Sequence, residues 1–113
     1  MTQEARLNNT DPLSLLRNEI DEIDETIIAL LEKRMRIAGR IGKVKQLQGI
    51  AVRDNSREKD ILARIADKKL DPKISESISA IYGEIFNQSR ALQAEKPRKS
   101  FPRRMSRIEK IQL

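Results

Sequence analysis

The stretch DPLSLLRNEIDEIDETIIALLEKRMRIAGRIGKVKQLQ, residues 11–48, organises the rest of this chain. Its apolar residues follow one another at intervals of three or four, which places them on one face of an α-helix. Asp11 is a suitable N-cap, Pro12 suits the first helical position, and no strong stop signal follows before Gly49. At about 1.5 Å per residue, this helix would be on the order of 54 Å long. A single small domain cannot cover so long a face, so the pattern predicts a partner.

The apolar face of this helix forms a stripe whose positions are Leu13, Leu16, Ile20, Ile23, Ile27, Leu30, Arg34, Ile37, Ile41, Val44 and Gln48. Arg34 stands where an aliphatic side chain is expected. Lys45 follows Arg34 by about three turns and so points in nearly the same direction, while Arg17 flanks the stripe on the N-terminal side. Gly39 and Gly42 are expected only to weaken the helix, by roughly 1 kcal/mol each relative to alanine.

Two shorter helices are predicted after the long one, and no strand-like alternation is present, so the fold class is all-α. Asn55 with Glu58 forms a possible capping box for a helix from about Ser56 to Lys68, with Asp54 as an alternative cap. A second Asp-Pro start signal predicts a helix from Pro72 to about Ala94. That helix carries a main apolar stripe, Ile74, Ile78, Ile81, Ile85 and Leu92, and beside it a second row, Tyr82, Phe86, Ser89 and Gln93.

The length of 113 residues suggests one domain, which we place at residues 11–94. Residues 1–10 are expected to be a disordered lead-in, and residues 95–113 a basic, mostly disordered tail. The tail holds seven Lys or Arg and two Glu, so it accounts for +5 of the net charge of +6. The basicity therefore belongs to the tail, not to the helical domain.

Several classes of function are disfavoured by composition. The chain has no Cys and no His, which removes thiol chemistry and the commonest general base and metal ligand. No Gly-rich phosphate loop or metal-ligand cluster appears, so no cofactor and no metal are expected. The polar N-terminus shows no secretory signal, and no apolar run is long enough to span a bilayer. A cytoplasmic location is therefore expected.

Four cationic residues lie on or beside the packing faces: Arg17, Arg34, Lys45 and Arg57. A single such residue is usually explained by a packed stem and a hydrated head group. Several together, with few carboxylates facing them, would be costly to bury and predict a small polyanionic ligand. Glu58, Ser89 and Gln93 are individually explained by capping or surface polarity. Together they offer a carboxylate, a hydroxyl and an amide, which complements a ligand with carboxylates, a hydroxyl and an ether oxygen.

The runs LLRNEIDEIDETIIALLEKRMRIAGRIGKVKQ, VRDNSREKDIL and SRALQ occur in an order and spacing that resembles the all-helical chorismate mutases. The similarity covers roughly residues 12–93. It implies an intertwined antiparallel helical homodimer with two equivalent sites, which converts chorismate to prephenate on the branch toward phenylalanine and tyrosine. No prephenate-processing domain is visible, so a monofunctional enzyme is expected.

The resemblance also implies roles for individual residues. Arg34, and Arg17 of the partner subunit, would bind the two carboxylates of chorismate. Lys45 would contact a carboxylate and the ether oxygen, and Gln93 would donate a hydrogen bond to the same oxygen. Arg34, Lys45 and Gln93 are thus the expected catalytic residues.

The remaining expected substrate-binding residues come from the two shorter helices. Glu58 would hold the ring hydroxyl, and Asp54 would contribute through its backbone. Arg57 and Ser89 would complete the substrate shell. The reaction needs no proton transfer, so the missing His and Cys are no obstacle.

Three alternative functions are compatible with parts of the pattern. An isochorismate–pyruvate lyase has the same fold and a similar cationic site, and its products would distinguish it. A helical nucleic-acid-binding module would use the basic tail, but residues 1–94 carry a net charge of only +1 and no series of stacking aromatics is present. A purely structural coiled coil would leave Arg34 and Lys45 on the packing face unexplained.

Overall fold

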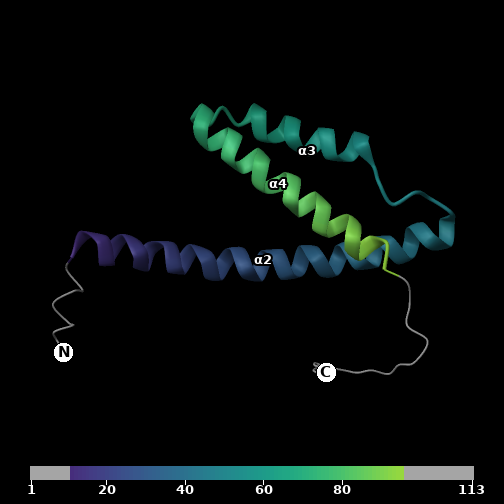
Figure 1. Cartoon of the computed structure of the whole chain (residues 1–113), viewed down its shortest axis with the longest axis horizontal. Helices are drawn as coiled ribbons and strands as arrows, with labels where there is room; N and C mark the ends of the chain where they lie inside the picture. Colours follow the sequence, from purple (N-terminus) through teal and green to yellow (C-terminus); the bar gives the residue numbers. More distant parts are fainter. Residues whose placement is uncertain (1–10, 96–113) are drawn as a thin grey trace, which may run out of the picture.

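The computed structural model describes residues 11–95, which form three α-helices and no strand (Figure 1). Helix α2 spans Pro12–Gln48, α3 spans Asn55–Asp67 and α4 spans Pro72–Gln93. The prediction of an all-α fold with one very long, one short and one medium helix is confirmed. The predicted lead-in and nearly all of the predicted tail lie outside the described residues. None of the three helices has an apolar segment long enough to span a bilayer.

Each helix begins after an aspartate whose side chain accepts a backbone N–H of the first turn: Asp11, Asp54 and Asp71. Of the two candidate caps for α3, Asp54 is therefore the one used, and the Asn55 side chain instead accepts a hydrogen bond from Arg53. Helix α2 ends at Gly49, whose φ of 69° is left-handed and favours glycine. These local signals set the start of all three helices and the end of α2.

The core lies where α4 packs between α2 and α3 (Figure 1). Helix α2 contributes Ala38 and Gly42, its two buried residues, so it meets α4 through small side chains rather than through the aliphatic stripe. Helix α4 contributes Phe86 and Ser89 of its second row, and α3 contributes Ile65. Ile74 and Ile81, which belong to the main apolar stripe of α4, are 54% and 60% exposed.

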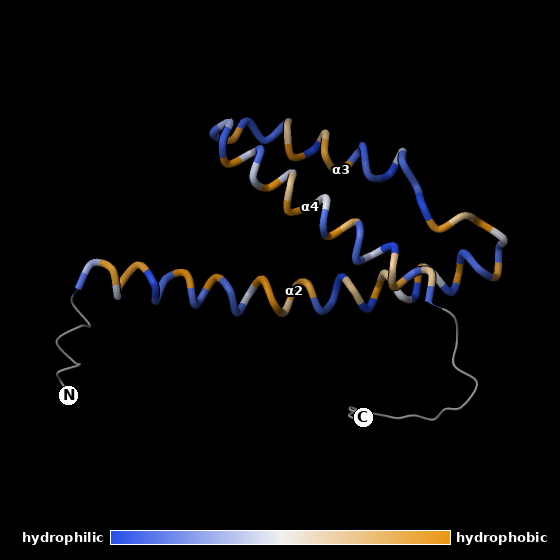
Figure 2. The backbone as a smooth tube through the Cα atoms, in the orientation of Figure 1, coloured by the Kyte–Doolittle hydropathy of each residue, from blue (hydrophilic) through white to orange (hydrophobic). Residues whose placement is uncertain are grey.

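Most of the α2 stripe is uncovered within the single chain. Hydrophobic residues recur along all of α2, including the N-terminal part that extends beyond α3 and α4 (Figure 2). Ile20 and Ile23 are 57% and 56% exposed, and Ile37 and Ile41 are 44% and 42% exposed. The Cα radius of gyration is 19.6 Å, against about 12–13 Å for a compact domain of this size. The chain by itself is an open frame with an unburied apolar face.

Candidate active site

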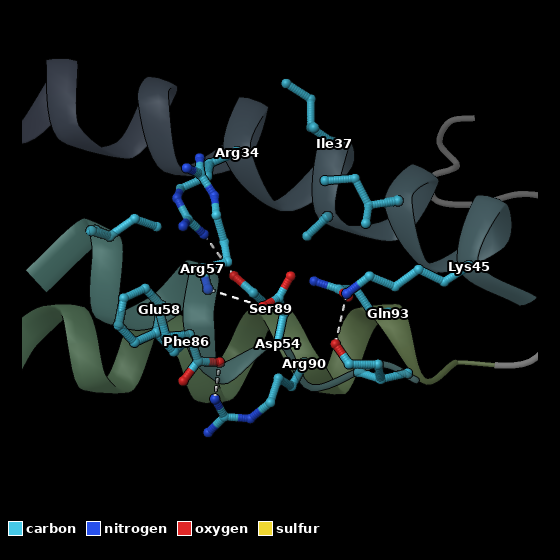
Figure 3. A pocket seen from close by; sticks show the side chains of 14 residues that line it. Arg34, Ile37, Lys45, Asp54, Arg57, Glu58, Phe86, Ser89, Arg90 and Gln93 are labelled. Carbon is cyan, nitrogen blue, oxygen red and sulfur yellow. Dashed lines mark hydrogen bonds and ion pairs between the residues drawn. The ribbon is translucent and has the colours of Figure 1, made fainter. Parts of the chain in front are cut away.

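A cavity of about 390 Å³ opens between the three helices (Figure 3). Its lining comes from the C-terminal half of α2, the linker to α3, the start of α3 and the end of α4. The lining residues are Arg34, Ile37, Ala38, Ile41, Lys45, Val52, Asp54, Arg57, Glu58, Ile61, Phe86, Ser89, Arg90 and Gln93. Seven of the eight residues that the sequence singled out thus line one cavity, and the eighth, Arg17, does not.

Arg34 is held at one end of the cavity by contacts with α4. Its Nη1 atom donates a 2.7 Å hydrogen bond to the Ser89 hydroxyl, and its guanidinium carbon lies 5.9 Å from the centroid of the Tyr82 ring. Ser89 is only 6% exposed, and its hydroxyl also donates to the Met35 sulfur at 3.9 Å. The buried Ser89 hydroxyl therefore has a hydrogen-bond partner both as acceptor and as donor. Its main effect is to orient the Arg34 guanidinium.

Lys45 and Gln93 form the other polar end of the cavity. The Lys45 ammonium donates to the Gln93 side-chain carbonyl at 2.8 Å and to the Val52 backbone carbonyl at 2.7 Å. An ammonium has only donors, so its partner on Gln93 must be the amide oxygen. The NH₂ group of Gln93 then remains as a donor toward the cavity (Figure 3). Lys45 itself keeps a third donor, since these two bonds use only two.

The start of α3 supplies both a cation and a carboxylate. The Asp54 side chain accepts the backbone N–H of Arg57 at 2.9 Å, and the Asp54 carbonyl accepts that of Glu58 at 3.1 Å. The cap thereby sets where Arg57 and Glu58 enter the cavity. Asp54 lines the cavity, and its side chain is at the same time the N-cap of α3.

Arg90 is a cavity residue that the sequence patterns did not single out. Its Nη1 atom pairs with Glu58, and both side chains are largely buried. A signal was present, because Arg90 follows Phe86 by four residues and so continues the buried row of α4. Arg90 lies beside Ser89 and Gln93, which the sequence did single out, but a lone arginine near the end of a helix is usually explained by solvation.

The charges of the cavity lining do not balance. Its cationic side chains are Arg34, Lys45, Arg57 and Arg90, and its carboxylates are Asp54 and Glu58. Two positive charges are therefore in excess. This electrostatic environment suits a ligand that carries two negative charges and has polar, uncharged groups for the remaining donors and acceptors.

Arg17 lies on the exposed N-terminal part of α2, far from the cavity of its own chain. The seventeen residues between Arg17 and Arg34 correspond to about 25 Å along a straight helix. Both residues belong to one continuous helix, so no bend brings them together. Within one chain, the structure does not bring Arg17 to the site.

Comparison with known proteins places this arrangement in a family context. Residues 16–94 match the sequence model of chorismate mutase type II. A chorismate mutase of Methanocaldococcus jannaschii is 31% identical over 86 residues, which are 75% of this chain and 87% of that protein. A bifunctional chorismate mutase/prephenate dehydratase of Escherichia coli is 41% identical over 59 residues, which are 52% of this chain but only 15% of that protein.

A solved structure also resembles the fold. It is a conserved hypothetical protein from Pyrococcus furiosus, with a TM-score of 0.62 and 36% identity, and the match covers 74% of this chain and 97% of that one. The family match covers α2 from Leu16 onward together with α3 and α4, and it includes every residue that lines the cavity. On this evidence, the chain belongs to the chorismate mutase type II family.

Proposed function

We propose that this protein is a chorismate mutase, which rearranges chorismate to prephenate without a cofactor. The observation that carries the proposal is the Lys45–Gln93 hydrogen bond. It orients the Gln93 side chain so that its NH₂ group points toward a cavity whose lining has two excess positive charges. The reaction breaks an ether C–O bond and forms a C–C bond within one molecule. Negative charge develops on the ether oxygen, where a fixed neutral donor and a cation both stabilise it.

The positions of the side chains around the cavity support the roles that the family resemblance implies. Arg34, held by Ser89, would bind one carboxylate of chorismate. The third donor of Lys45 and the NH₂ group of Gln93 would meet at the ether oxygen. Arg57 would add a cation to the substrate shell. Holding the dianion in its compact conformer brings the reacting carbons together, which contributes part of the rate acceleration.

The carboxylate of Glu58 and the backbone of Asp54 have a different proposed role. The substrate has a ring hydroxyl, and a carboxylate at the start of α3 can accept a hydrogen bond from it. The backbone of Asp54 would contribute to binding beside the same ring hydroxyl. No proposed step moves a proton, so none of these residues acts as a general acid or base.

We further infer that the working unit is an antiparallel homodimer in which α2 of one subunit lies along α2 of the other. Supporting this are the exposed stripe of α2 and the extended shape of the single chain. An exposed apolar surface of this extent is typical of an interaction surface. Antiparallel pairing would also bring Arg17 of the partner subunit to the open side of the cavity, beside Arg34, where it would bind the second carboxylate.

The deciding experiment is a spectrophotometric assay of chorismate disappearance with identification of the product. We expect prephenate to form in stoichiometric amount. The same protein should be incubated with isochorismate, since salicylate plus pyruvate as the main products would identify a lyase instead. No turnover of chorismate by folded protein would refute the proposed function.

A further inference from the structure

The ion pair of Arg90 and Glu58 joins two helices in the wall of the cavity (Figure 3). Glu58 lies in the first turn of α3, and Arg90 lies in the last turn of α4. The Arg90 and Glu58 side chains are 22% and 18% exposed, respectively. The pair is therefore largely withdrawn from solvent, where its electrostatic effect is stronger than on the surface.

Glu58 poses an electrostatic problem in a cavity that takes a dianion. An unpaired carboxylate would be poorly solvated there and would repel the carboxylates of the ligand. Arg90 bonds to one oxygen, Oε2, and supplies the compensating charge. The other oxygen of Glu58 remains able to accept a hydrogen bond from a hydroxyl group.

The guanidinium of Arg90 is itself oriented by residues of its own helix. Its Nη2 atom donates to the Asn87 side-chain carbonyl, and the Asn87 amide donates to Glu84 Oε1 at 3.2 Å. Hydrogen bonds from the Gln88 and Asn87 side chains lower the pKa of the Glu84 carboxyl, which keeps this acceptor ionised. Because Asn87 bonds in both directions, its amide is held in one orientation. The hydrogen bond from Nη2 to Asn87 thus orients the guanidinium of Arg90 so that Nη1 faces Glu58.

We propose that Arg90 is a positioning residue, which acts on the substrate only through Glu58. It balances the charge of that carboxylate and presents its free oxygen to the ring hydroxyl of the substrate. This inference rests on the proposed function. The ring hydroxyl takes no part in the bond that breaks or the bond that forms, so we expect its hydrogen bond to stabilise the ground state and the transition state about equally. The loss of Arg90 should therefore act mainly on KM.

The first test compares three variants in the chorismate assay. Arg90→Met keeps an unbranched apolar stem in place of the aliphatic part of arginine but removes the charge and the donors. We expect kcat/KM to fall at least about tenfold, mostly through KM. Arg90→Lys keeps the positive charge and a donor group that can bond to Glu58, and should remain within about threefold of wild type. Arg36→Met is the matched control, since Arg36 pairs with Glu32 at 2.8 Å on the exposed surface of α2 and does not line the cavity.

The second test asks whether Arg90 acts through Glu58. In a Glu58→Gln background there is no carboxylate charge to balance, so adding Arg90→Met should change kcat/KM by less than about twofold. Additive losses would mean that Arg90 binds the substrate directly, and would overturn the inference. A loss in melting temperature without a change in KM would also overturn it, because the ion pair would then be only structural.

The result also separates this inference from the proposed function. Wild-type protein that forms prephenate while Arg90→Met retains full kcat/KM would overturn the role of Arg90 alone. Wild-type protein that does not convert chorismate would overturn both.

Discussion

Gly42 lies directly against the backbone of Gln93. A Cβ atom on Gly42 would stand 2.3 Å from the Gln93 carbonyl oxygen and 2.5 Å from its Cα atom. Real Cβ atoms do not approach backbone atoms so closely, so the end of α4 would have to move. Because Gln93 carries the amide donor of the cavity, the position of that donor depends on how closely α4 packs against Gly42 of α2. As expected from the sequence, Gly42 does not interrupt α2. Its close contact with Gln93 is a packing role that the sequence did not predict.

Gly42→Ala should damage both stability and activity. Overpacking of this kind costs about 1–3 kcal/mol in the free energy of unfolding. A shift of Gln93 by about 1 Å should reduce kcat/KM on the order of a hundredfold. Urea denaturation at fixed protomer concentration and steady-state kinetics would measure the two effects.

Gly39→Ala is the matched control, because a Cβ atom there meets nothing within 4 Å in the chain. We expect unchanged kcat/KM and a gain of up to about 1 kcal/mol from better helix propensity. Equal behaviour of the two alanine variants would contradict the role given to Gly42.

The pH dependence of activity should depend on Gln93. The amide of Gln93 donates without titrating, so the wild-type profile should be fairly flat around neutrality. In Gln93→Glu the carboxyl donates only when protonated, and the nearby Lys45 ammonium favours its ionised form and lowers its pKa. Activity of this variant should therefore rise as the pH falls below neutrality and be lost as the pH rises.

Gln46→Glu is the control for this experiment. Gln46 lies on α2, next to Lys45, but its side chain donates to the backbone carbonyl of Glu95 and does not line the cavity. Its pH–rate profile should match that of wild type. An unchanged profile for Gln93→Glu would mean that Gln93 is not the donor to the ether oxygen.

Two inactive proteins should complement each other if the site is shared between subunits. Arg17→Ala and Arg34→Ala homodimers should each be nearly inactive, since each lacks one carboxylate clamp at both sites. In a mixed dimer, the intact Arg34 of one chain meets the intact Arg17 of the other at one complete site. Refolding an equimolar mixture should give about half heterodimers and recover about a quarter of wild-type activity. No recovery, with heterodimers verified by mass, would exclude the shared site.

The basic tail should be dispensable for turnover. Every residue that lines the described cavity falls between Arg34 and Gln93. A variant truncated after Glu95 should keep most of its kcat/KM at about 0.15 M salt, where long-range steering by the tail charges is screened. A loss of more than about tenfold at equal concentration of folded protein would show that the tail takes part in the site.

The three helices and most of the charged and polar groups of the cavity, Arg90 excepted, can be predicted from the amino-acid sequence alone. Helix periodicity and the Asp and Gly signals predicted all three helices, because both depend on residues only a few positions apart. Arg34 and Lys45 stood out because a cation on an apolar stripe is costly without a ligand. That inference uses only the periodicity of one helix, so it does not require knowledge of how the helices pack.

The tertiary structure decided which faces meet. Gly39 and Gly42 have the same expected cost in helix propensity, and only the crossing of α4 over α2 puts a backbone against one of them. The second row of α4, not its more apolar stripe, faces the cavity, and this is why Arg90 pairs with Glu58. These contacts join residues 32 to 51 positions apart, and their geometry depends on how three helices cross, which no local pattern encodes.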